Sequence, residues 1–261
     1  MKYKAEDEKR LMTELWSVNV KDDPLNFVKF AFPWGMKDTP LEDFKGPRKW
    51  QEKILREMTI HIARNGTRDL PEMFRMATAS GRGIGKSALV SWIVLWMLST
   101  RLGATIIVTA NTEQQLRSRT WAELGKWMTL SINSHWFHKT ATTIKPAPWF
   151  QEALERDLKI DTGYYYAQAQ LWSEENPDAF AGIHSSYGVC LIMDEASGIP
   201  SPIYSVSEGF FTEPTQNRYW FTFSNPRRNT GPFYDSFNSK KKFWQNLQID
   251  SRTVEGTDQK L

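Results

Sequence analysis

The segment that most constrains the fold is residues 79–87, ASGRGIGKS, a glycine-rich turn that ends in Gly-Lys-Ser. Glycines at alternating positions let successive backbone N–H groups point into one concavity, which is a site for anions. Lys86 can then reach the β- and γ-phosphates of a nucleotide, and the Ser87 hydroxyl can ligate magnesium. Residues 73–78 read as a strand, and residues 86–100 read as a helix whose N-terminus faces the phosphates. This order of strand, loop and helix predicts a nucleotide site.

The loop departs from the usual pattern at one position. Glycine normally stands five residues before the Gly-Lys pair, and here Ser80 holds that place, with Gly81 following. Glycine and serine are common in ordinary turns, so the string alone could arise by chance, but the flanking strand and helix favour a nucleotide site. The predicted nucleotide-binding residues of the loop are Ser80, Gly81, Arg82, Gly83, Ile84, Gly85, Lys86 and Ser87.

Length and composition narrow the class of protein. The 261 residues are enough to bury a full core, and 33 basic against 30 acidic residues do not by themselves argue for a polyanionic partner. The single cysteine, Cys190, excludes an internal disulfide and suits a reducing cytoplasm. The longest apolar stretch, residues 92–98, is far shorter than the ~20 residues of a membrane span, so it indicates a buried helix.

Alternating apolar strands and helices predict an α/β fold with a mostly parallel central sheet covered by helices on both faces. The expected strands are residues 73–78, 104–109, 189–193 and 218–223, and the expected helices are residues 1–20, 47–64, 86–100 and 112–130. Short strands with a hairpin are expected within residues 140–185. We divide the chain into an N-terminal helical subregion (1–72), a core (73–250) and a tail (251–261).

Two adjacent carboxylates follow the apolar strand 189–193. Asp194 is expected to hold magnesium together with Ser87, and Glu195, expected on the opposite face of the pleat, is expected to orient or deprotonate an attacking water. An acidic loop after a buried strand is common in α/β proteins, but its position after the glycine-rich loop favours the catalytic interpretation. The adjacent glutamate indicates attack by water rather than phosphoryl transfer to a small-molecule hydroxyl.

Phosphoryl transfer also needs positive charge near the γ-phosphate. Arg82 lies inside the loop and could supply it within the same chain, so the predicted catalytic residues are Glu195, Lys86 and Arg82. Arg82 could equally contact a neighbouring acidic side chain. Arg117, Arg119 and Arg156 are candidates for donation to a neighbouring subunit, although any one of them is more easily read as a solvated arginine.

Two further segments are assigned to the site. The strand 218–223 leads into Ser224 and Asn225, and a polar strand tip beside the loop could sense the γ-phosphate; Thr222, Ser224 and Asn225 are the predicted sensor residues. Upstream, Trp50 and Gln51 open a helix, and a glutamine amide can both donate to and accept from an adenine edge. This favours ATP as the nucleotide, the alternative being an ordinary helix start.

Together these motifs resemble the large terminase subunit of tailed bacteriophages. The resemblance covers residues 30–34, FAFPW; residues 47–51, PRKWQ; the arginine-bearing loop; residues 176–184, NPDAFAGIH; and residues 224–226, SNP. It implies a P-loop NTPase of the additional-catalytic-glutamate type, with Lys86 in the Walker A motif and with Asp194 and Glu195 in the Walker B motif. It also implies adenine recognition at Gln51 and a motif near residues 222–225 that couples hydrolysis to DNA movement.

The same resemblance implies a function and partners. Mg²⁺-dependent ATP hydrolysis would drive double-stranded DNA into a capsid in the cytoplasm of the infected bacterium, through a homo-oligomeric ring docked on a portal protein and served by a small terminase subunit. Family members usually carry a nuclease domain after the ATPase, and here only the tail 251–261 follows, so we expect no DNA cutting. A helicase-like remodelling ATPase and a nucleotide-binding assembly module with little turnover remain the alternatives. Independent sequence support for DNA binding is modest: Arg227, Arg228 and the run Lys240, Lys241 and Lys242, which is equally typical of a solvated turn.

Overall fold

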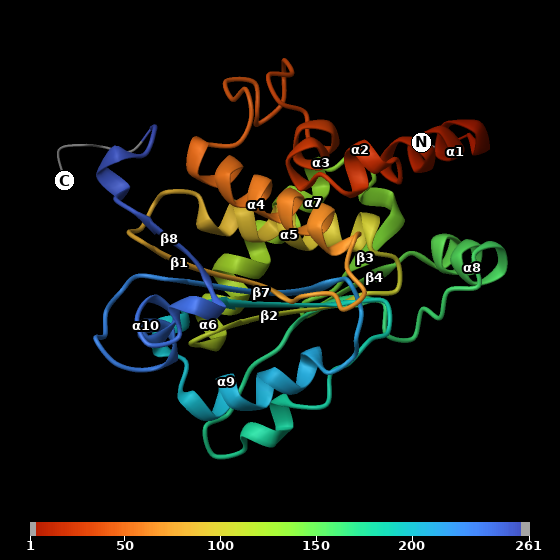
Figure 1. Ribbon diagram of the computed structural model, residues 1–261. Coiled ribbons are helices and arrows are strands. Elements are labelled where there is room, and N and C mark those ends of the chain that lie inside the picture. Colours follow the sequence, from red (N-terminus) through yellow and green to blue (C-terminus); the bar gives the residue numbers. More distant parts are fainter. Residues whose placement is uncertain (1–3, 257–261) are drawn as a thin grey trace.

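The computed structural model describes residues 4–256 and contains one central sheet (Figure 1). Within these residues the sheet has eight strands in the order β3-β4-β5-β2-β6-β7-β1-β8. The strands are β1 (Phe74–Ser80), β2 (Thr105–Ala110), β3 (Phe137–Lys139), β4 (Thr143–Pro146), β5 (Tyr166–Ala169), β6 (Val189–Asp194), β7 (Arg218–Ser224) and β8 (Gln245–Ile249). The glycine-rich loop follows β1, and the Asp-Glu pair follows β6, with β7 between these two strands.

The prediction of a mostly parallel sheet is confirmed. All strands from β5 to β8 across the sheet pair in parallel, whereas β3 and β4 form an antiparallel hairpin that joins the edge of β5. The hairpin lies in and beside the region where short strands were expected. The strand β8 was not predicted; four of its five residues are partly buried and Gln248 is exposed, and the strand lacks the continuous apolar run that marks β6 and β7.

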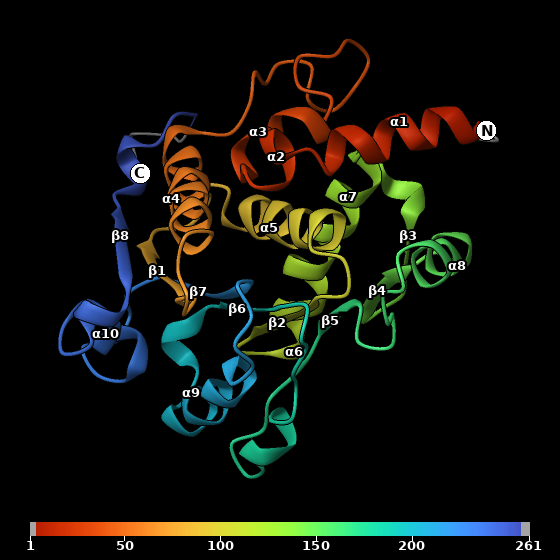
Figure 2. The same cartoon turned by 45° about the vertical axis from the view of Figure 1, so that its right-hand side comes forward.

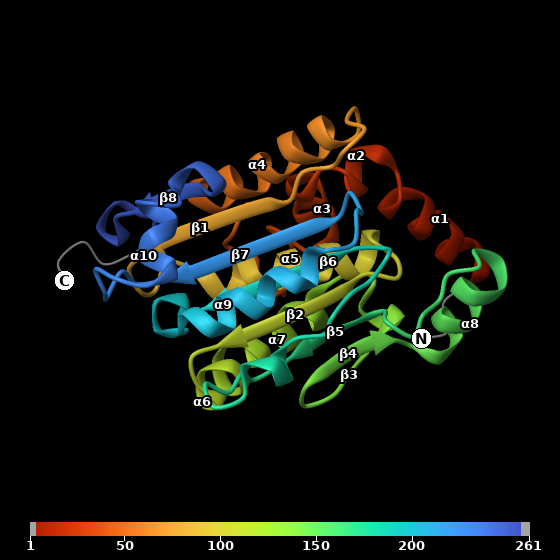
Figure 3. The same cartoon turned by 60° about the horizontal axis from the view of Figure 1, so that its bottom comes forward.

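Helices cover both faces of the sheet (Figures 1 and 3). They are α1 (Ala5–Leu15), α2 (Val18–Lys21), α3 (Pro24–Ala31), α4 (Lys49–Asn65), α5 (Lys86–Thr100), α6 (Glu113–Gln115), α7 (Ala122–Leu130), α8 (Pro148–Asp157), α9 (Ser201–Ser207) and α10 (Pro232–Phe237). The N-terminal helices α1 to α4 lie on the same side as α5 and α7, while α9 lies on the other side (Figures 1 and 2). Within residues 4–256, no helix combines the length and apolar character needed to cross a membrane.

Two predicted helices differ from the structure in detail, and one helix was not predicted. The expected helix 1–20 is interrupted between α1 and α2. The expected helix 112–130 is continuous and capped by the Thr112 hydroxyl, which accepts from the Gln115 N–H, but its middle, η1 (Leu116–Trp121), is a π-helical turn. The helix α8 was not predicted, because the region 140–185 was assigned to strands.

The alternation of side chains along the strands divides the apolar residues between the two faces. Along β6, Cys190 and Ile192 point into the layer beneath α5, and Leu191 and Met193 point into the layer that holds α9. Asp194 continues the series of Cys190 and Ile192, so its carboxylate lies on the α5 face. The register of β6 thus decides which face of the sheet receives the charge.

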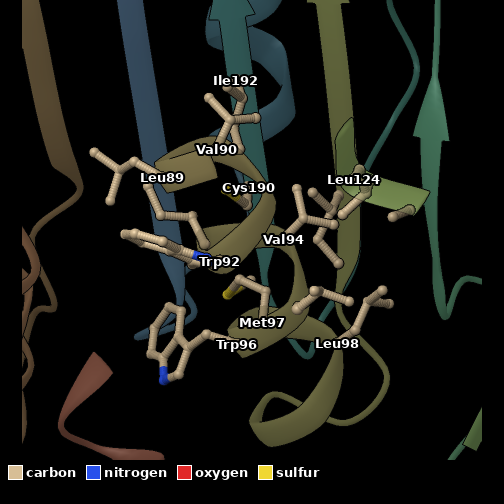
Figure 4. Close-up of a cluster of buried hydrophobic side chains, with 14 of the residues drawn as sticks. Leu89, Val90, Trp92, Val94, Trp96, Met97, Leu98, Leu124, Cys190 and Ile192 are labelled. Carbon is tan, nitrogen blue, oxygen red and sulfur yellow. The ribbon is translucent and has the colours of Figure 1, made fainter. Parts of the chain in front are cut away.

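The helix α5 is buried on nearly every side, which is why its sequence shows no polar stripe. Figure 4 shows Leu89, Trp92 and other α5 side chains packed with Cys190 and Ile192 of β6. Leu124 of α7 closes the same cluster. This packing holds the helix, and therefore the loop before it, in a fixed position above the carboxyl ends of the strands.

His61 anchors α4 to the same face of the sheet. Its ring centroid lies 5.2 Å from that of Phe74 on β1 and 6.2 Å from that of Tyr219 on β7, and its Nε2 lies 3.0 Å from Nδ2 of Asn65. Burial of the ring lowers the pKa of His61 to about 4, and the nearby Glu72 carboxylate only partly opposes this. The imidazole is therefore neutral in the folded protein at neutral pH.

This environment predicts a pH-dependent stability. The unfolded His61 titrates near pH 6.5, so between pH 6.5 and 4 the unfolded chain binds a proton that the folded protein excludes, and stability falls as the pH falls. Relative to His61→Gln, wild type should lose about 2 kcal/mol of unfolding free energy between pH 7.5 and 4.5, measured by urea denaturation. Parallel pH profiles for the two proteins would contradict the buried neutral imidazole.

Candidate nucleotide site

The glycine-rich loop joins the end of β1 to the first residue of α5, as the sequence predicts. Gly83 and Gly85 have φ angles of +72° and +90°, a left-handed conformation that favours glycine. Gly81 is favoured for a different reason, because a Cβ atom at this position would meet the Ser251 side chain, which would have to move. Ser80, at the position where the usual pattern has glycine, is the last residue of β1 and is buried beside β8.

Side chains at the start of α4 hold the outer side of the loop. The indole Nε1 of Trp50 donates to the Ile84 carbonyl at 3.1 Å, and Nε2 of Gln51 donates to the Gly85 carbonyl at 2.9 Å. Arg48 Nη1 reaches the Gly83 carbonyl at 3.4 Å. These contacts turn three loop carbonyls toward α4.

Both ends of the Gln51 amide are occupied in this arrangement. Its Oε1 accepts from the Arg48 N–H at 2.8 Å at the start of α4, and its Nε2 donates to the Gly85 carbonyl. The side chains of Trp50 and Gln51 are buried. The structure thus brings both predicted residues to the loop, in contact with its backbone.

On its inner side the loop borders a cavity of about 600 Å³. Lys86, Ser87, Asp194 and Glu195 line this cavity together with Arg82. The Nζ atom of Lys86 is buried and has no hydrogen-bond partner among residues 4–256. Burial lowers the pKa of Lys86, and the neighbouring Asp194 and Glu195 carboxylates raise it in opposition. A buried cation without an acceptor is the arrangement that a phosphate oxygen would complete.

Asp194, the last residue of β6, is buried with both carboxylate oxygens engaged. Its Oδ2 accepts from the Thr120 hydroxyl at 2.7 Å, and its Oδ1 accepts from the Glu195 N–H at 3.0 Å. Burial raises the pKa of this carboxyl above its usual range, while the Thr120 hydrogen bond and the charge of Lys86 act in the opposite direction. These contacts fix the orientation of the carboxylate beside Lys86.

The expectation that Glu195 points to the opposite face of the pleat is wrong. Glu195 lies just beyond β6 with φ +52° and ψ 39°, a left-handed conformation that is uncommon for a residue with a Cβ atom. This breaks the strand alternation, so Glu195 lines the same cavity as Asp194. Strained backbone of this kind occurs at functional sites, where it aims a side chain.

The tip of β7 contacts the loop that follows Glu195. The Ser224 Oγ atom accepts from the Ser197 N–H at 3.1 Å and lies 2.8 Å from the Ser197 Oγ atom. Asn225 follows with its Oδ1 atom buried and without a hydrogen-bond partner among the described residues. Thr222 is buried beside Met193, on the sheet face opposite α5. None of the three predicted sensor residues lines the cavity, and Thr222 is separated from it by the sheet.

The candidate arginines fall into two groups. Arg82 and Arg119 are exposed and line the cavity with Lys86. Arg117 pairs with Glu113 one turn earlier, and Arg156 pairs with Asp157 on α8. Only the first two are therefore placed to act within this chain's own cavity.

Three contributors were missed by reasoning from the sequence: Arg48, Thr120 and Ser197. Arg48 is close to Trp50 and Gln51 in the sequence, so the segment that predicts a role for those two residues could also have pointed to Arg48. Thr120 and Ser197 act through contacts with residues 74 and 27 positions away in the chain, and no local pattern marks them.

The donor set fits a nucleotide phosphate chain with a magnesium ion. The left-handed glycines and the buried Lys86 Nζ atom suit the phosphates, and the Ser87 hydroxyl and Asp194 carboxylate offer the oxygen ligands that Mg²⁺ prefers. Within residues 4–256 there is no cluster of three or more His, Cys, Asp or Glu side chains that could hold a metal alone. A magnesium site here would therefore depend on phosphate oxygens as further ligands.

Comparison with known proteins gives one curated relative. A protein described as "Probable terminase, large subunit", from Enterobacteria phage P7, is 29% identical over 168 residues, which cover 61% of this chain and 30% of the relative. The chain thus spans less than a third of the length of the relative that it matches. No family model matches the chain. The relative confirms the resemblance to large terminase subunits that the motifs indicate.

Solved structures of large terminases also align with the chain. The large terminase of bacteriophage D6E, in complex with ADP, is 14% identical with a TM-score of 0.44, over 87% of this chain and 44% of that one. The ATPase domain of the Thermus phage P74-26 large terminase is 15% identical with a TM-score of 0.42, over 72% of this chain and 78% of that one.

The contacts of Gln51 predict a measurable role in stability. Gln51→Ala should lower the free energy of unfolding by about 2 kcal/mol, because it leaves the Arg48 N–H without its acceptor and the Gly85 carbonyl without the Gln51 donor. Gln51→Glu, which keeps the acceptor for the Arg48 N–H but sets a buried carboxylate oxygen against the Gly85 carbonyl oxygen, should be at least as destabilised as Gln51→Ala in urea denaturation. Gln114→Ala, at an exposed position on α6, is the matched control. Equal stability of Gln51→Ala and wild type would show that the contacts do not hold the loop.

Proposed function

We propose that this chain is the ATPase part of a large terminase subunit, which hydrolyses ATP with Mg²⁺ to move double-stranded viral DNA into a capsid. The observation that carries the proposal is the cavity beside the glycine-rich loop, which Lys86, Asp194 and Glu195 line together. The relative from phage P7 supports the assignment to packaging.

Each residue assigned to the site has its own role in the proposed hydrolysis. Backbone N–H groups of the loop and the N-terminus of α5 bind the phosphate oxygens, and Lys86 donates to the β- and γ-phosphates. Ser87 and Asp194 would hold Mg²⁺, which when bound neutralises charge on the phosphate oxygens. Glu195 orients a water and accepts its proton as the water oxygen bonds to the γ-phosphorus and the bond to the ADP oxygen breaks. Arg82 stabilises the charge on the γ-phosphate.

Recognition of adenine is assigned to the outer side of the loop. A cavity of about 690 Å³ opens there, lined by Phe44, Arg48, Glu52 and Glu255 among others. Gln51 adjoins this region through Arg48, whose backbone N–H donates to the Gln51 Oε1 atom. To hydrogen-bond to adenine, the Gln51 amide would have to release either the Arg48 N–H or the Gly85 carbonyl. We therefore propose that base binding and the loop contacts compete for this side chain.

We further propose that the tip of β7 transmits the state of the nucleotide. Ser224 bonds to Ser197, two residues after Glu195, and the exposed Arg227 and Arg228 follow directly. A movement of Glu195 on hydrolysis can reach these arginines through the serine pair. Lys240, Lys241 and Lys242, which are also exposed, extend the basic surface that would track DNA phosphates.

The partners belong to the same proposal. A homo-oligomeric ring, a portal protein, a small terminase subunit and action in the cytoplasm of the infected bacterium follow from the terminase assignment. The exposed position of Arg119 at the cavity leaves it accessible to a neighbouring subunit as well as to this chain's own nucleotide.

Two substitutions test the catalytic assignment. Glu195→Gln should lower the rate of ATP hydrolysis by about 10²–10⁴-fold and leave the Kd for ATP nearly unchanged, because it removes the acceptor of the water proton without touching the loop. Lys86→Ala should raise the Kd by about 10–100-fold, because it removes a charged donor. Steady-state ATPase assays and equilibrium nucleotide titrations measure both effects.

Glu152→Gln, at an exposed position on α8, is the matched control for the glutamate substitution. Loss of ATP binding in Glu195→Gln would assign that residue to the architecture of the site. Normal turnover in Lys86→Ala would overturn the location of the site itself. Tight binding without hydrolysis by wild type would favour the assembly-module alternative.

The DNA assignment predicts that linear double-stranded DNA stimulates the ATPase. Replacing Lys240, Lys241 and Lys242 by alanine should weaken DNA binding and reduce the slope of log affinity against log salt by about 0.9 for each lysine that contacts a phosphate. Replacing the exposed Lys37, Lys53 and Lys145 removes the same charge elsewhere and serves as control. Equal stimulation by single-stranded DNA would favour the helicase-like alternative, and an unchanged salt slope would remove the lysines from the DNA surface.

A further inference from the structure

The helix that follows β2 contains a π-helical turn beside the Asp194 carboxylate. The turn, η1, spans Leu116–Trp121 and is continuous with α6 before it and α7 after it. A π turn adds a residue to the helical repeat, and such turns occur frequently at functional sites. Here two consecutive residues of the turn, Thr120 and Trp121, are both buried.

The side chains of these two residues lie in different environments. The Trp121 indole packs in the apolar core, and its Nε1 donates to the Thr140 carbonyl at 3.3 Å. The Thr120 hydroxyl instead donates to Oδ2 of Asp194 at 2.7 Å. A single turn of helix thus supplies both a core side chain and a polar contact at the cavity.

The Thr120 contact completes the support of the carboxylate. Oδ1 of Asp194 is held by the N–H of Glu195 at 3.0 Å, and Oδ2 has Thr120 as its hydrogen-bond donor. Thr120 is 1% exposed and Asp194 is 8% exposed, so water does not readily replace the hydroxyl. Side chains that hydrogen-bond to metal ligands orient them, and their loss commonly costs 10–100-fold in metal affinity.

We infer that Thr120 is a positioning residue, which holds the Asp194 carboxylate in the orientation that binds the Mg²⁺ of the Mg–ATP complex. The inference rests on the proposed function, because it takes Asp194 as a magnesium ligand. Thr120 touches neither nucleotide nor metal in this role; it acts through Asp194. The π turn is what brings its hydroxyl to the carboxylate while Trp121 stays in the core.

The test measures binding rather than turnover. A fluorescent, non-hydrolysable ATP analogue is titrated onto the protein in EDTA and then at increasing Mg²⁺ concentrations. Thr120→Val, which keeps the side-chain shape and removes the hydroxyl, should need about 10–100-fold more Mg²⁺ for the same tightening of binding. Its affinity in EDTA should equal that of wild type, and Thr120→Ser should restore the Mg²⁺ dependence.

Two further variants complete the design. Thr120→Ala removes the hydroxyl without leaving a methyl group beside the carboxylate, so it must show the same shift even if the valine variant folds poorly. Thr129→Val on α7 is the matched control, because its exposed hydroxyl bonds only to the Gly125 carbonyl of its own helix in the described structure. Thr129→Val should bind the analogue as wild type does.

The outcomes separate the two proposals. If Asp194→Asn abolishes the Mg²⁺ effect while Thr120→Val and Thr120→Ala retain it, the role of Thr120 is overturned and the proposed function stands. If Asp194→Asn keeps the full Mg²⁺ effect, the metal role of Asp194 fails and the inference fails with it. Equal weakening in EDTA and in Mg²⁺ for both hydroxyl-free variants would assign Thr120 to general architecture and overturn the inference.

Discussion

Burying the Lys86 ammonium, which has no hydrogen-bond acceptor among residues 4–256, costs free energy, and the neighbouring groups of the site offset part of that cost. Lys86 is stabilised in part by the Asp194 and Glu195 carboxylates across the cavity. Removal of any of these groups would leave the others as buried or poorly compensated charges. The charges of these three groups therefore stabilise or destabilise one another before any ligand binds. A phosphate chain would supply the acceptor that residues 4–256 do not provide for the Lys86 Nζ atom.

The apolar layers decide where these charges meet. Cys190 and Ile192 point toward α5, so Asp194, two residues further along β6, faces the start of that helix. Because α5 is buried on nearly every side, its N-terminus cannot shift without disturbing the packing shown in Figure 4. The core beneath the site thus sets the separation between the cation and the carboxylates.

Backbone restraint on the loop comes from outside the strand–loop–helix unit. Trp50 and Gln51 bind loop carbonyls from α4, and Ser251, beyond β8, packs so closely on Gly81 that a Cβ atom there would displace its side chain. Carbonyls that are satisfied on the outer side leave the N–H groups free to face the cavity. The strand order, with β8 beside β1, makes the last contact possible.

The sequence by itself determined the strand–loop–helix unit, the parallel sheet and the carboxylates after β6, because each depends on local patterns: glycine spacing and continuous apolar runs. It did not reveal β8, whose residues are partly buried or exposed, or the π turn that carries Thr120. The face on which Glu195 lies was predicted wrongly, since strand alternation ends where the backbone turns left-handed. Only the tertiary structure decided these points, because contacts such as Thr120 with Asp194 join residues that are distant in the chain, and their geometry depends on how helices pack on the sheet.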